Sequence, residues 1–545
     1  MKYIKINPAD NVAVALQDLA KGEVVEGVTL QMDIPRGHKI VLHSLKAGEN
    51  VIKYGFPIGH VTRDAEAGTL VDHSCIKTNL EGLLDYKYEP LDYVKEDQSQ
   101  TKTFSTHKGS EKVLSAPSVI PSSSSVIPSS SSVIPSEASV SPRTFKGFRR
   151  ADGQVGIRNQ IWVIPTVGCV NGICEQIVNK FKSSVIPSSS SVIPSEASVS
   201  PSSVDAIVCF PHNYGCSQLG DDHENTRKVL ADMIHHPNAG GVLVVSLGCE
   251  NNQLDAFREL VGPVDESRVK MFVCQKVDDE VAYGVERLKE IYAVASKDVR
   301  EDVPVSELRV GLKCGGSDGL SGITANPLLG VFSDWMVAQG GTTVLTEVPE
   351  MFGAETILMN RCQDRATFDK TVHLINDFKE YFMKQGMPVY ENPSPGNKAG
   401  GISTLEEKSL GCTQKCGKSI VRGVLKYAER LSVKGLNLLS APGNDLVAST
   451  ALAASGCQIV LFTTGRGTPF GSFVPTMKIS TNTPLYEAKP SWIDFNAGVL
   501  AQGEPMEDVA ARFIDFVLAA ASGEMVNNEK HGIREIAIFK QGVTL

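Results

Sequence analysis

Long apolar runs and an excess of basic residues are both missing from this sequence. No apolar run approaches the roughly 20 residues that a membrane span needs, and the N-terminus, MKYIKINPADNVAVAL, has no long apolar core and no small-residue cleavage site. Lys and Arg number 53 against 62 Asp and Glu, which gives a formal net charge of −9 at pH 7 and argues against a general nucleic-acid role. We therefore expect a cytoplasmic protein that binds neither membranes nor nucleic acid.

Cysteine pairs with the CxxC spacing of a zinc ribbon are also absent. The chain has 12 cysteines but no CxxC pair, which argues against a closed structural zinc site. Without an export signal, these cysteines are expected to be thiols or metal ligands rather than disulfides. Nucleotide motifs fail as well, because GCTQKCGKS (411–419) has five residues between its glycines instead of four and GRGTPFG (465–471) misses the dinucleotide fingerprint.

Two low-complexity tracts divide the chain. SSVIPSSSSVIPSEASVSP occurs at 124–142 and again at 183–201, and Ser and Pro at this density cannot bury a core. We expect a Ser/Pro-rich linker at 96–143 and a surface-loop insertion at 183–203. A chain of 545 residues is long for one core, so several domains are expected.

The pattern of apolar residues predicts an α/β protein with a small all-β module in front. Residues 1–95 alternate short apolar runs with turns, as in GHKIVLHSL and NVIKYGFPIGHV. Residues 144–300 and 301–545 instead repeat a strand, a Gly-rich turn and a helix, which indicates two α/β domains with mainly parallel sheets. In such sheets ligands bind beyond the carboxyl ends of the strands.

Three of these strand ends are each followed by a Gly-Cys pair. The cysteines are Cys169, Cys216 and Cys249, and His223, Glu250 and Asn251 follow two of them closely. A single thiol of this kind is more often a small buried hydrophobe. The acidic stretch 221–224 would, taken alone, be the solvated start of a helix. Together they favour an active or metal site, and mixed N, O and S donors suit iron or manganese before zinc.

Other turns offer groups for an anionic substrate. Asn397 and Lys398 lie in a turn-rich stretch that is either a mobile surface loop or a carboxylate clamp. Arg466 follows a buried strand, and its planar fork matches a carboxylate. His38 and Lys39 precede a strand of the β module, where a lone His is more often structural. In PGND (442–445), Asp445 is the expected N-cap of the next helix.

Long motifs along the chain resemble the altronate/galactarate dehydratase family. They include DNVAVAL, GHK, VIKYGFPIG, GCSQLGDDH, GLSGITANP, TEVPEMFGAE, NPSPGNKAGG, SAPGND, TTGRGTPFG and IFKQGVTL. The resemblance covers the chain apart from the Ser/Pro tracts, although His60 and Cys416 depart from the residues expected there. It implies an N-terminal SAF-type β-clip module, a second α/β domain and a larger C-terminal α/β domain. It also implies dehydration of D-altronate to 2-dehydro-3-deoxy-D-gluconate in hexuronate breakdown, with Fe²⁺ or Mn²⁺ required.

The chemistry of such a dehydration assigns roles to the candidate residues. The C2 proton beside a carboxylate is weakly acidic, so the enediolate formed on its removal needs a Lewis acid and fixed donors. A general acid must then protonate the departing C3 hydroxyl. The hypothesis places the metal on Cys216, His223, Cys249 and Glu250. Catalytic roles go to His38, Lys39, His223 and Lys398, and substrate binding to Asn251, Asn397, Lys398 and Arg466.

Several alternatives remain open at this stage. The substrate could be galactarate or another sugar acid handled by the same family. An iron–sulfur dehydratase could use Cys169, Cys216 and Cys249 as cluster ligands. A non-catalytic sugar-acid binder or sensor is a third alternative, and a homodimer is compatible with all of them.

Overall fold

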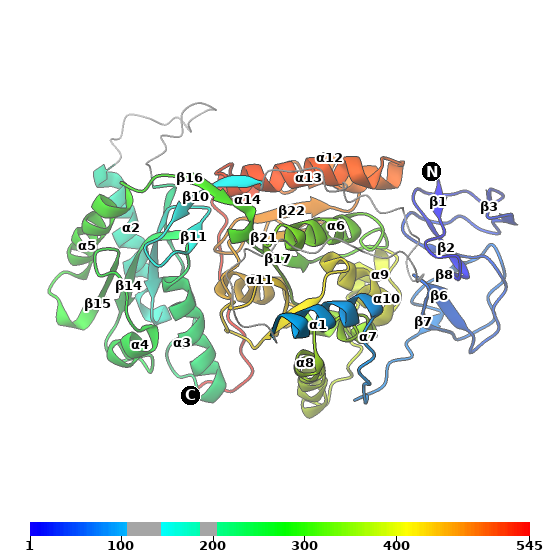
Figure 1. The fold of residues 1–545 in the computed structure, drawn as a ribbon, viewed down its shortest axis with the longest axis horizontal. Coiled ribbons are helices and arrows are strands. Elements are labelled where there is room, and N and C mark those ends of the chain that lie inside the picture. The colour runs from blue at the N-terminus through cyan, green and yellow to red at the C-terminus, as the bar shows by residue number, and fades with distance from the viewer. Residues whose placement is uncertain (106–142, 186–203) are drawn as a thin grey trace.

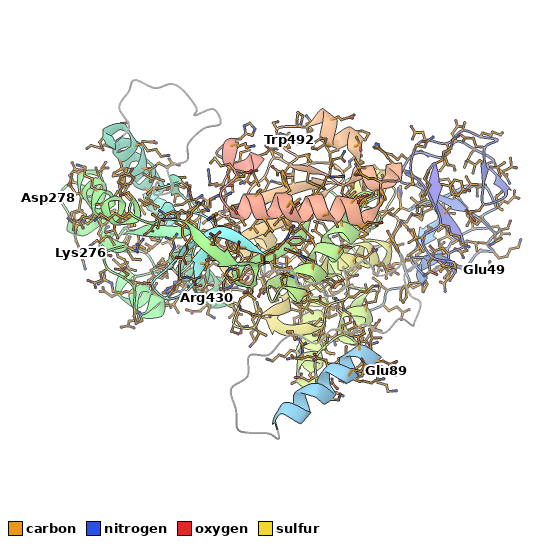
Figure 2. All side chains as sticks on the ribbon, turned by 45° about the horizontal axis from the view of Figure 1, so that its top comes forward. Glu49, Glu89, Lys276, Asp278, Arg430 and Trp492 are labelled. Atoms are coloured by element: carbon orange, nitrogen blue, oxygen red, sulfur yellow. The ribbon has the colours of Figure 1, made fainter. Side chains whose placement is uncertain are left out.

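Three parts follow one another along the long axis of the molecule. The structure, a computed structural model, describes residues 1–105, 143–185 and 204–545. The first Ser/Pro tract, the second apart from residues 183–185, and most of the predicted linker and insertion lie outside these residues. The second domain lies at one end, the N-terminal module at the other and the C-terminal domain between them (Figure 1). Lys276 and Asp278 mark the outer end of the second domain in Figure 2, and Glu49 that of the N-terminal module.

The N-terminal module is built from short antiparallel strands, as the alternating apolar runs predict. One sheet has the order β1-β2-β5-β8 and another the order β6-β7-β9, with a β3-β4 ribbon beside them. Val12, Val41, Val51 and Ile58 are among the residues of its small core. The strands are β1 (Tyr3–Ile4), β2 (Val12–Ala15), β3 (Val24–Val25), β4 (Val28–Thr29), β5 (Lys39–Val41), β6 (Asn50–Lys53), β7 (Phe56–Val61), β8 (Leu70–Val71) and β9 (Ile76–Lys77).

The segment after the module lies along the C-terminal domain and ends in helix α1 (Asp92–Ser105). Tyr93 Oη donates to the Lys418 carbonyl at 2.9 Å, and Arg422 binds the Asp97 carboxylate at 2.6 and 2.8 Å. The helix therefore extends into the segment predicted as linker and is held against the C-terminal domain.

The second domain contains a four-stranded parallel sheet with the order β13-β12-β14-β15. Alternate residues of β12 face opposite cores: Ile161 and Val163 pack with α2 and α5, and Trp162 and Ile164 with α3 and α4. The elements are β12 (Gln160–Pro165), α2 (Asn171–Val185), β13 (Ala206–Cys209), α3 (Gly220–Ile234), β14 (Ala239–Ser246), α4 (Leu254–Val261), β15 (Val269–Val273) and α5 (Glu280–Ala295). A small antiparallel sheet of β10 (Thr144–Arg149), β11 (Val155–Gly156) and β16 (Glu301–Pro304) connects this domain to the next.

The C-terminal domain is organised by a seven-stranded parallel sheet with the order β19-β20-β18-β17-β21-β22-β23. The chain leaves β17 (Arg309–Cys314) for β18 (Thr342–Leu345) on one side and returns to β21 (Ile459–Thr464) on the other. This reversal is the point at which ligands bind in open α/β sheets. The other strands are β19 (Val421–Leu425), β20 (Gly435–Leu439), β22 (Thr476–Ser480) and β23 (Phe495–Asn496).

Helices cover both faces of this sheet. Helices α6 and α13 pack with the core of one face, whereas α11 packs on the other face together with α3 of the second domain, so the two α/β domains share a core. The helices are α6 (Ala325–Ala338), α7 (Glu355–Met359), α8 (Arg365–Lys384), α9 (Pro395–Ala399), α10 (Leu405–Cys412), α11 (Asp445–Ala454), α12 (Thr483–Ala488), α13 (Met506–Ala521) and α14 (Asn527–Lys530). The predicted fold class, a β module followed by two α/β domains with parallel sheets, is confirmed. In the parts of the chain that the structure describes, none of the helices combines the length and apolarity needed to cross a bilayer.

Candidate active site

A buried cluster of thiols and a carboxylate lies at the carboxyl ends of β17 and β18. Cys314 is the last residue of β17, Glu350 ends the short turn η4 (Val348–Glu350) after β18, and Cys412 ends helix α10. The two sulfur atoms are 3.2 Å apart, and Glu350 Oε2 lies 3.1 Å from Cys412 Sγ and 3.5 Å from Cys314 Sγ. Among the described residues this is the one group of three whose ligand atoms lie within 4.8 Å of one another and could hold a metal ion.

Glu347 joins this cluster to two buried lysines. Its carboxylate binds Lys313 Nζ and, at 3.0 Å, Lys415 Nζ, and it accepts the Cys314 N–H at 3.0 Å. Lys415 Nζ also lies 2.9 Å from Cys314 Sγ, and Lys313 Nζ reaches Asp445 at 2.9 Å. Glu347 has φ = 69°, a left-handed conformation that is uncommon outside glycine and that these bonds hold in place.

Glu350 is paired with the third lysine, Lys408, at 2.8 Å. Burial alone would raise the pKa of Glu350, but Lys408, Lys313 and Lys415 outweigh it and hold that pKa at about 2. The Lys408 ammonium also donates to the Asn392 side chain at 3.1 Å. The Glu350 carboxylate is therefore ionised at neutral pH although it is buried.

The residues of the cluster fit the metal ion that the family resemblance implies. Its three ammonium groups, those of Lys313, Lys408 and Lys415, match the carboxylates of Glu347, Glu350 and Asp445 in number. The hydrogen bond to Cys314 and burial raise the pKa of the Cys412 thiol well above its usual range. A divalent ion would be balanced by ionisation of both thiols. Thiolate donors suit iron, and the carboxylate donor suits manganese.

The N-terminal module closes a pocket beside this cluster. The pocket wall includes Lys53 and Tyr54 of the module, Asp318 in the loop after β17, and Lys408 and Cys412 of α10. The backbone of Gly37 packs so closely on that loop that a Cβ on Gly319 would lie 2.0 Å from the Gly37 carbonyl oxygen. Residues of the N-terminal module and of the C-terminal domain therefore form one concave surface.

A buried charge triad fixes the module to α10. Glu407 binds Lys39 Nζ at 2.9 Å and Lys53 Nζ at 2.7 Å, and Lys39 Nζ also donates to the Gly401 carbonyl at 2.8 Å. Burial alone would raise the pKa of Glu407, but the two ammonium groups outweigh it and hold that pKa at about 2. The triad thereby fixes the helix that carries Lys408 and Cys412.

Five of the residues predicted from the sequence surround this region of the C-terminal domain. Lys39 is fully buried in the triad, whereas His38 is half-buried and its Nδ1 lies 3.2 Å from the Arg36 carbonyl. Asn397 is buried, and its Nδ2 donates to the Ser317 carbonyl in the loop after β17 at 2.8 Å. Lys398 is half-buried one residue along. Arg466 has an exposed side chain, and its backbone N–H binds the Gly316 carbonyl at 2.9 Å.

The other predicted residues lie in the second domain, at the carboxyl edge of its sheet. The three Gly-Cys turns are adjacent there: Gly168 N–H donates to the Tyr214 carbonyl at 3.0 Å and Asn252 N–H to the Gly215 carbonyl at 3.1 Å. Asn251 is exposed, and its Oδ1 accepts the Ser217 N–H at 2.8 Å. The structure therefore places these turns side by side, with the thiols of Cys169, Cys216 and Cys249 exposed.

Two of the predicted metal ligands, Glu250 in one of these turns and His223 in helix α3, have contrasting surroundings. The Glu250 carboxylate is bound by the Thr166 hydroxyl at 2.7 Å, the Ser246 hydroxyl and two backbone N–H groups, so it braces its own turn. His223 is half-buried with its Nε2 unpartnered, and burial lowers its pKa.

The four predicted metal ligands lie far from His38 and Lys39, the catalytic residues predicted in the N-terminal module. Cys216, His223, Cys249 and Glu250 do not form a compact group of three ligands in the described parts of the chain. The N-terminal module lies at the opposite end of the molecule (Figure 1), and Lys39 is bound to the C-terminal domain. Within one chain, His38 and Lys39 therefore do not reach this set, which stays a prediction.

The acidic residues of GCSQLGDDH have a structural role that the sequence did not reveal. Asp222 accepts the N–H groups of Gln541 and Gly542 at 2.8 and 2.7 Å, and the Leu545 N–H donates to the Ser217 carbonyl at 3.0 Å. The stretch therefore anchors the last residues of the chain across two domains.

Sequence reasoning missed the lysine, thiol and carboxylate cluster, although a signal was present. In both RVGLKC and TTVLTEVPE, an apolar strand is followed at its carboxyl end by polar residues. The same signal identified the Gly-Cys turns as a candidate site. Cys412 lies in GCTQKCGKS, a stretch considered above only as a nucleotide motif. The missed residues are Lys313, Cys314, Asp318, Glu347, Glu350, Glu407, Lys408, Cys412 and Lys415.

Comparisons with known proteins agree with this architecture. Three family models match: the altronate/galactarate dehydratase SAF domain at 1–79, the D-galactarate dehydratase/altronate hydrolase second domain at 147–296, and the D-galactarate/altronate dehydratase C-terminal domain at 305–544. The chain is 54% identical to altronate dehydratase of Bacillus subtilis (100% of this chain, 99% of the relative) and 51% identical to that of Escherichia coli (100% of both). It is 32% identical to the galactarate dehydratase (L-threo-forming) of Escherichia coli, over 98% of this chain and 96% of the relative. The family prediction is confirmed, and the chain belongs to the altronate/galactarate dehydratase family.

Proposed function

We propose that the protein dehydrates D-altronate to 2-dehydro-3-deoxy-D-gluconate, as a step of hexuronate breakdown in the cytoplasm. Its identity to the two altronate dehydratases, 54% and 51%, exceeds its 32% identity to the galactarate dehydratase, which favours altronate as the substrate. The observation that carries the proposal is the pocket between the N-terminal module and α10, with its buried lysines, carboxylates and thiols at the strand ends of the C-terminal domain.

The pocket contains cations that suit a sugar-acid substrate. Lys53 and Lys408 both line it, and each is paired with a buried carboxylate, Glu407 and Glu350 respectively. An ammonium group in a water-poor pocket attracts a carboxylate more strongly than one in bulk water. Lys408 would hold the acid end of the substrate against the cluster.

The two carboxylates of the pocket wall differ in basicity, which indicates the base. Two ammonium groups hold the pKa of Glu407 at about 2, so this carboxylate is a weak base. Burial raises the pKa of Asp318 despite hydrogen bonds from Thr481 and Ser321. A carboxylate with a raised pKa accepts a proton more readily, and we assign C2 proton removal to Asp318.

Fe²⁺ or Mn²⁺ is proposed as the cofactor, held by Cys314, Glu350 and Cys412. Such an ion supplies a Lewis acid that lowers the free energy of the enediolate. The donor set and the charge balance of the cluster support this position, whereas the exposed Cys216 and Cys249 lack a third ligand at comparable distance among the described residues.

A substrate comparison tests the function. Anaerobic protein with added Fe²⁺ or Mn²⁺ is offered altronate, galactarate and sulfolactate in parallel, and the 2-keto product is measured. We expect turnover of altronate above both others, and turnover of galactarate alone would overturn the assignment. The homodimer stays a prediction, for which light scattering of the purified protein gives the mass.

A further inference from the structure

Tyr54 brings a phenol from the N-terminal module into the pocket of the C-terminal domain. It lies in the turn between β6 and β7 and is 8% exposed, and it lines the same pocket as Asp318 and Lys408. Its φ of 62° is in the left-handed region, which is rare for a bulky residue and strains the backbone. The surrounding structure therefore holds this side chain in a conformation that the isolated chain would avoid.

Glycines of the C-terminal domain make room for the phenol oxygen. A Cβ on Gly322 would lie 2.3 Å from Tyr54 Oη and 2.9 Å from the Gly411 Cα. A Cβ on Gly411 would lie 3.7 Å from the same oxygen. The hydroxyl therefore reaches the backbone of α10 one residue before Cys412, at the part of the pocket nearest the cluster.

The neighbour of Tyr54 is suited to stabilise a phenolate. The Lys53 ammonium lies 4.8 Å from the centroid of the Tyr54 ring and is held by Glu407 at 2.7 Å, which in turn binds Lys39 at 2.9 Å. Burial raises the pKa of Tyr54, so the hydroxyl keeps its proton at neutral pH. When that proton leaves, the Lys53 ammonium is already in place to stabilise the negative oxygen.

We propose that Tyr54 is the general acid that protonates the departing C3 hydroxyl, an inference that rests on the proposed dehydration. The C3–O bond breaks with its electron pair on oxygen, the oxygen takes the Tyr54 proton, and water leaves. When Asp318 takes the C2 proton, the electron pair left at C2 forms the C2=C3 double bond. The resulting enol loses its O–H proton to solvent and gains a solvent proton at C3, which gives the 2-keto acid. The proton on Asp318 and the one missing from Tyr54 are both exchanged with solvent before the next turnover, which restores the starting state.

This role accounts for the N-terminal module as part of the active site. The C-terminal domain supplies the base and the cluster, but among the described residues of the pocket wall Tyr54 is the one phenol. The triad of Lys39, Glu407 and Lys53 then positions the acid as well as the helix. Substrate binding needs the pocket, whereas loss of the C3 hydroxyl needs the Tyr54 proton.

The test uses full-length Tyr54→Phe, which keeps the ring and removes the hydroxyl. Tyr3→Phe is the matched control, because it removes a phenol of the same module that accepts the Glu26 N–H at 3.2 Å and does not line the pocket. Metal-loaded proteins are compared in D₂O for 2-keto acid production and for deuterium at C2 of unreacted altronate, and thermal unfolding shows that each variant is folded. We expect dehydration by Tyr54→Phe to fall by about 10²–10⁴ with KM unchanged, while deuterium still enters C2.

Each other outcome overturns a defined part of the account. Dehydration by Tyr54→Phe at the rate of Tyr3→Phe would remove Tyr54 from the chemistry. If Tyr54→Phe lost both C2 exchange and dehydration, the phenol would shape the pocket and would not be the acid. Absence of 2-keto product from the wild-type protein would instead overturn the proposed function itself.

Discussion

Lys39 and Glu407 are 368 residues apart in the sequence and form an ion pair of 2.9 Å that is sealed from solvent. Lys53, from another strand of the same module, binds the second oxygen of that carboxylate at 2.7 Å. Helix α10 is fixed through Glu407, and the same helix carries Lys408 and Cys412. The ion pairs that attach the N-terminal module therefore also set the geometry of the pocket.

Replacement of the shared carboxylate is expected to be costly. Glu407→Gln leaves two buried ammonium groups without a counter-charge, which we expect to destabilise the folded protein by about 3–5 kcal/mol. The exposed pair Lys2–Glu23 gives the control, because exposed ion pairs contribute little and Glu23→Gln should leave the urea midpoint nearly unchanged. Urea unfolding measures both, and equal effects of the two variants would contradict a stabilising triad.

The lowered pKa of Glu407 predicts that the folded protein loses stability in acid. The folded-state pKa of Glu407 is lowered from 4.5 to about 2, so the unfolded chain binds this proton first as pH falls. Its contribution is complete above pH 4.5 and disappears as the pH falls towards 2. The urea midpoint of the wild type should therefore drop across this window more steeply than that of Glu407→Gln, and parallel curves would contradict the lowered pKa.

Asp318→Asn tests the assignment of the base. The amide keeps the shape of the side chain but cannot take the C2 proton, so kcat is expected to fall by about 10²–10⁴ with little change in KM. Deuterium exchange at C2 should be lost as well, in contrast to Tyr54→Phe. Asp302→Asn, in an exposed pair with Lys146, is the control, and normal C2 exchange by Asp318→Asn would contradict the assignment.

Much of the fold could be predicted because its signals are local. Alternating apolar runs mark the strands of the β module, and the repeat of strand, Gly-rich turn and helix marks both parallel sheets. Even so, the N-cap of α11 was predicted one residue too late. Asn444 caps the helix by accepting the N–H groups of Leu446 and Val447, and Asp445 instead binds Lys313.

The candidate site was harder to predict, because both sheets end in polar turns. The rule that ligands bind at strand ends applies equally to the Gly-Cys turns and to the loops after β17 and β18. The metal site was predicted in the second domain because its thiols and His223 are close in sequence. Ion pairs between residues hundreds of positions apart, such as Lys53 with Glu407, leave no local pattern to read.

The location of the metal tests the central claim most directly. Cys314→Ser and Cys216→Ser are purified anaerobically, loaded with Fe²⁺ and desalted, and iron per chain is measured beside the wild type. We predict that Cys314→Ser loses bound iron and altronate dehydration together, while Cys216→Ser keeps both. Iron retained by Cys314→Ser and lost from Cys216→Ser would contradict a site in the C-terminal domain and place it at the Gly-Cys turns.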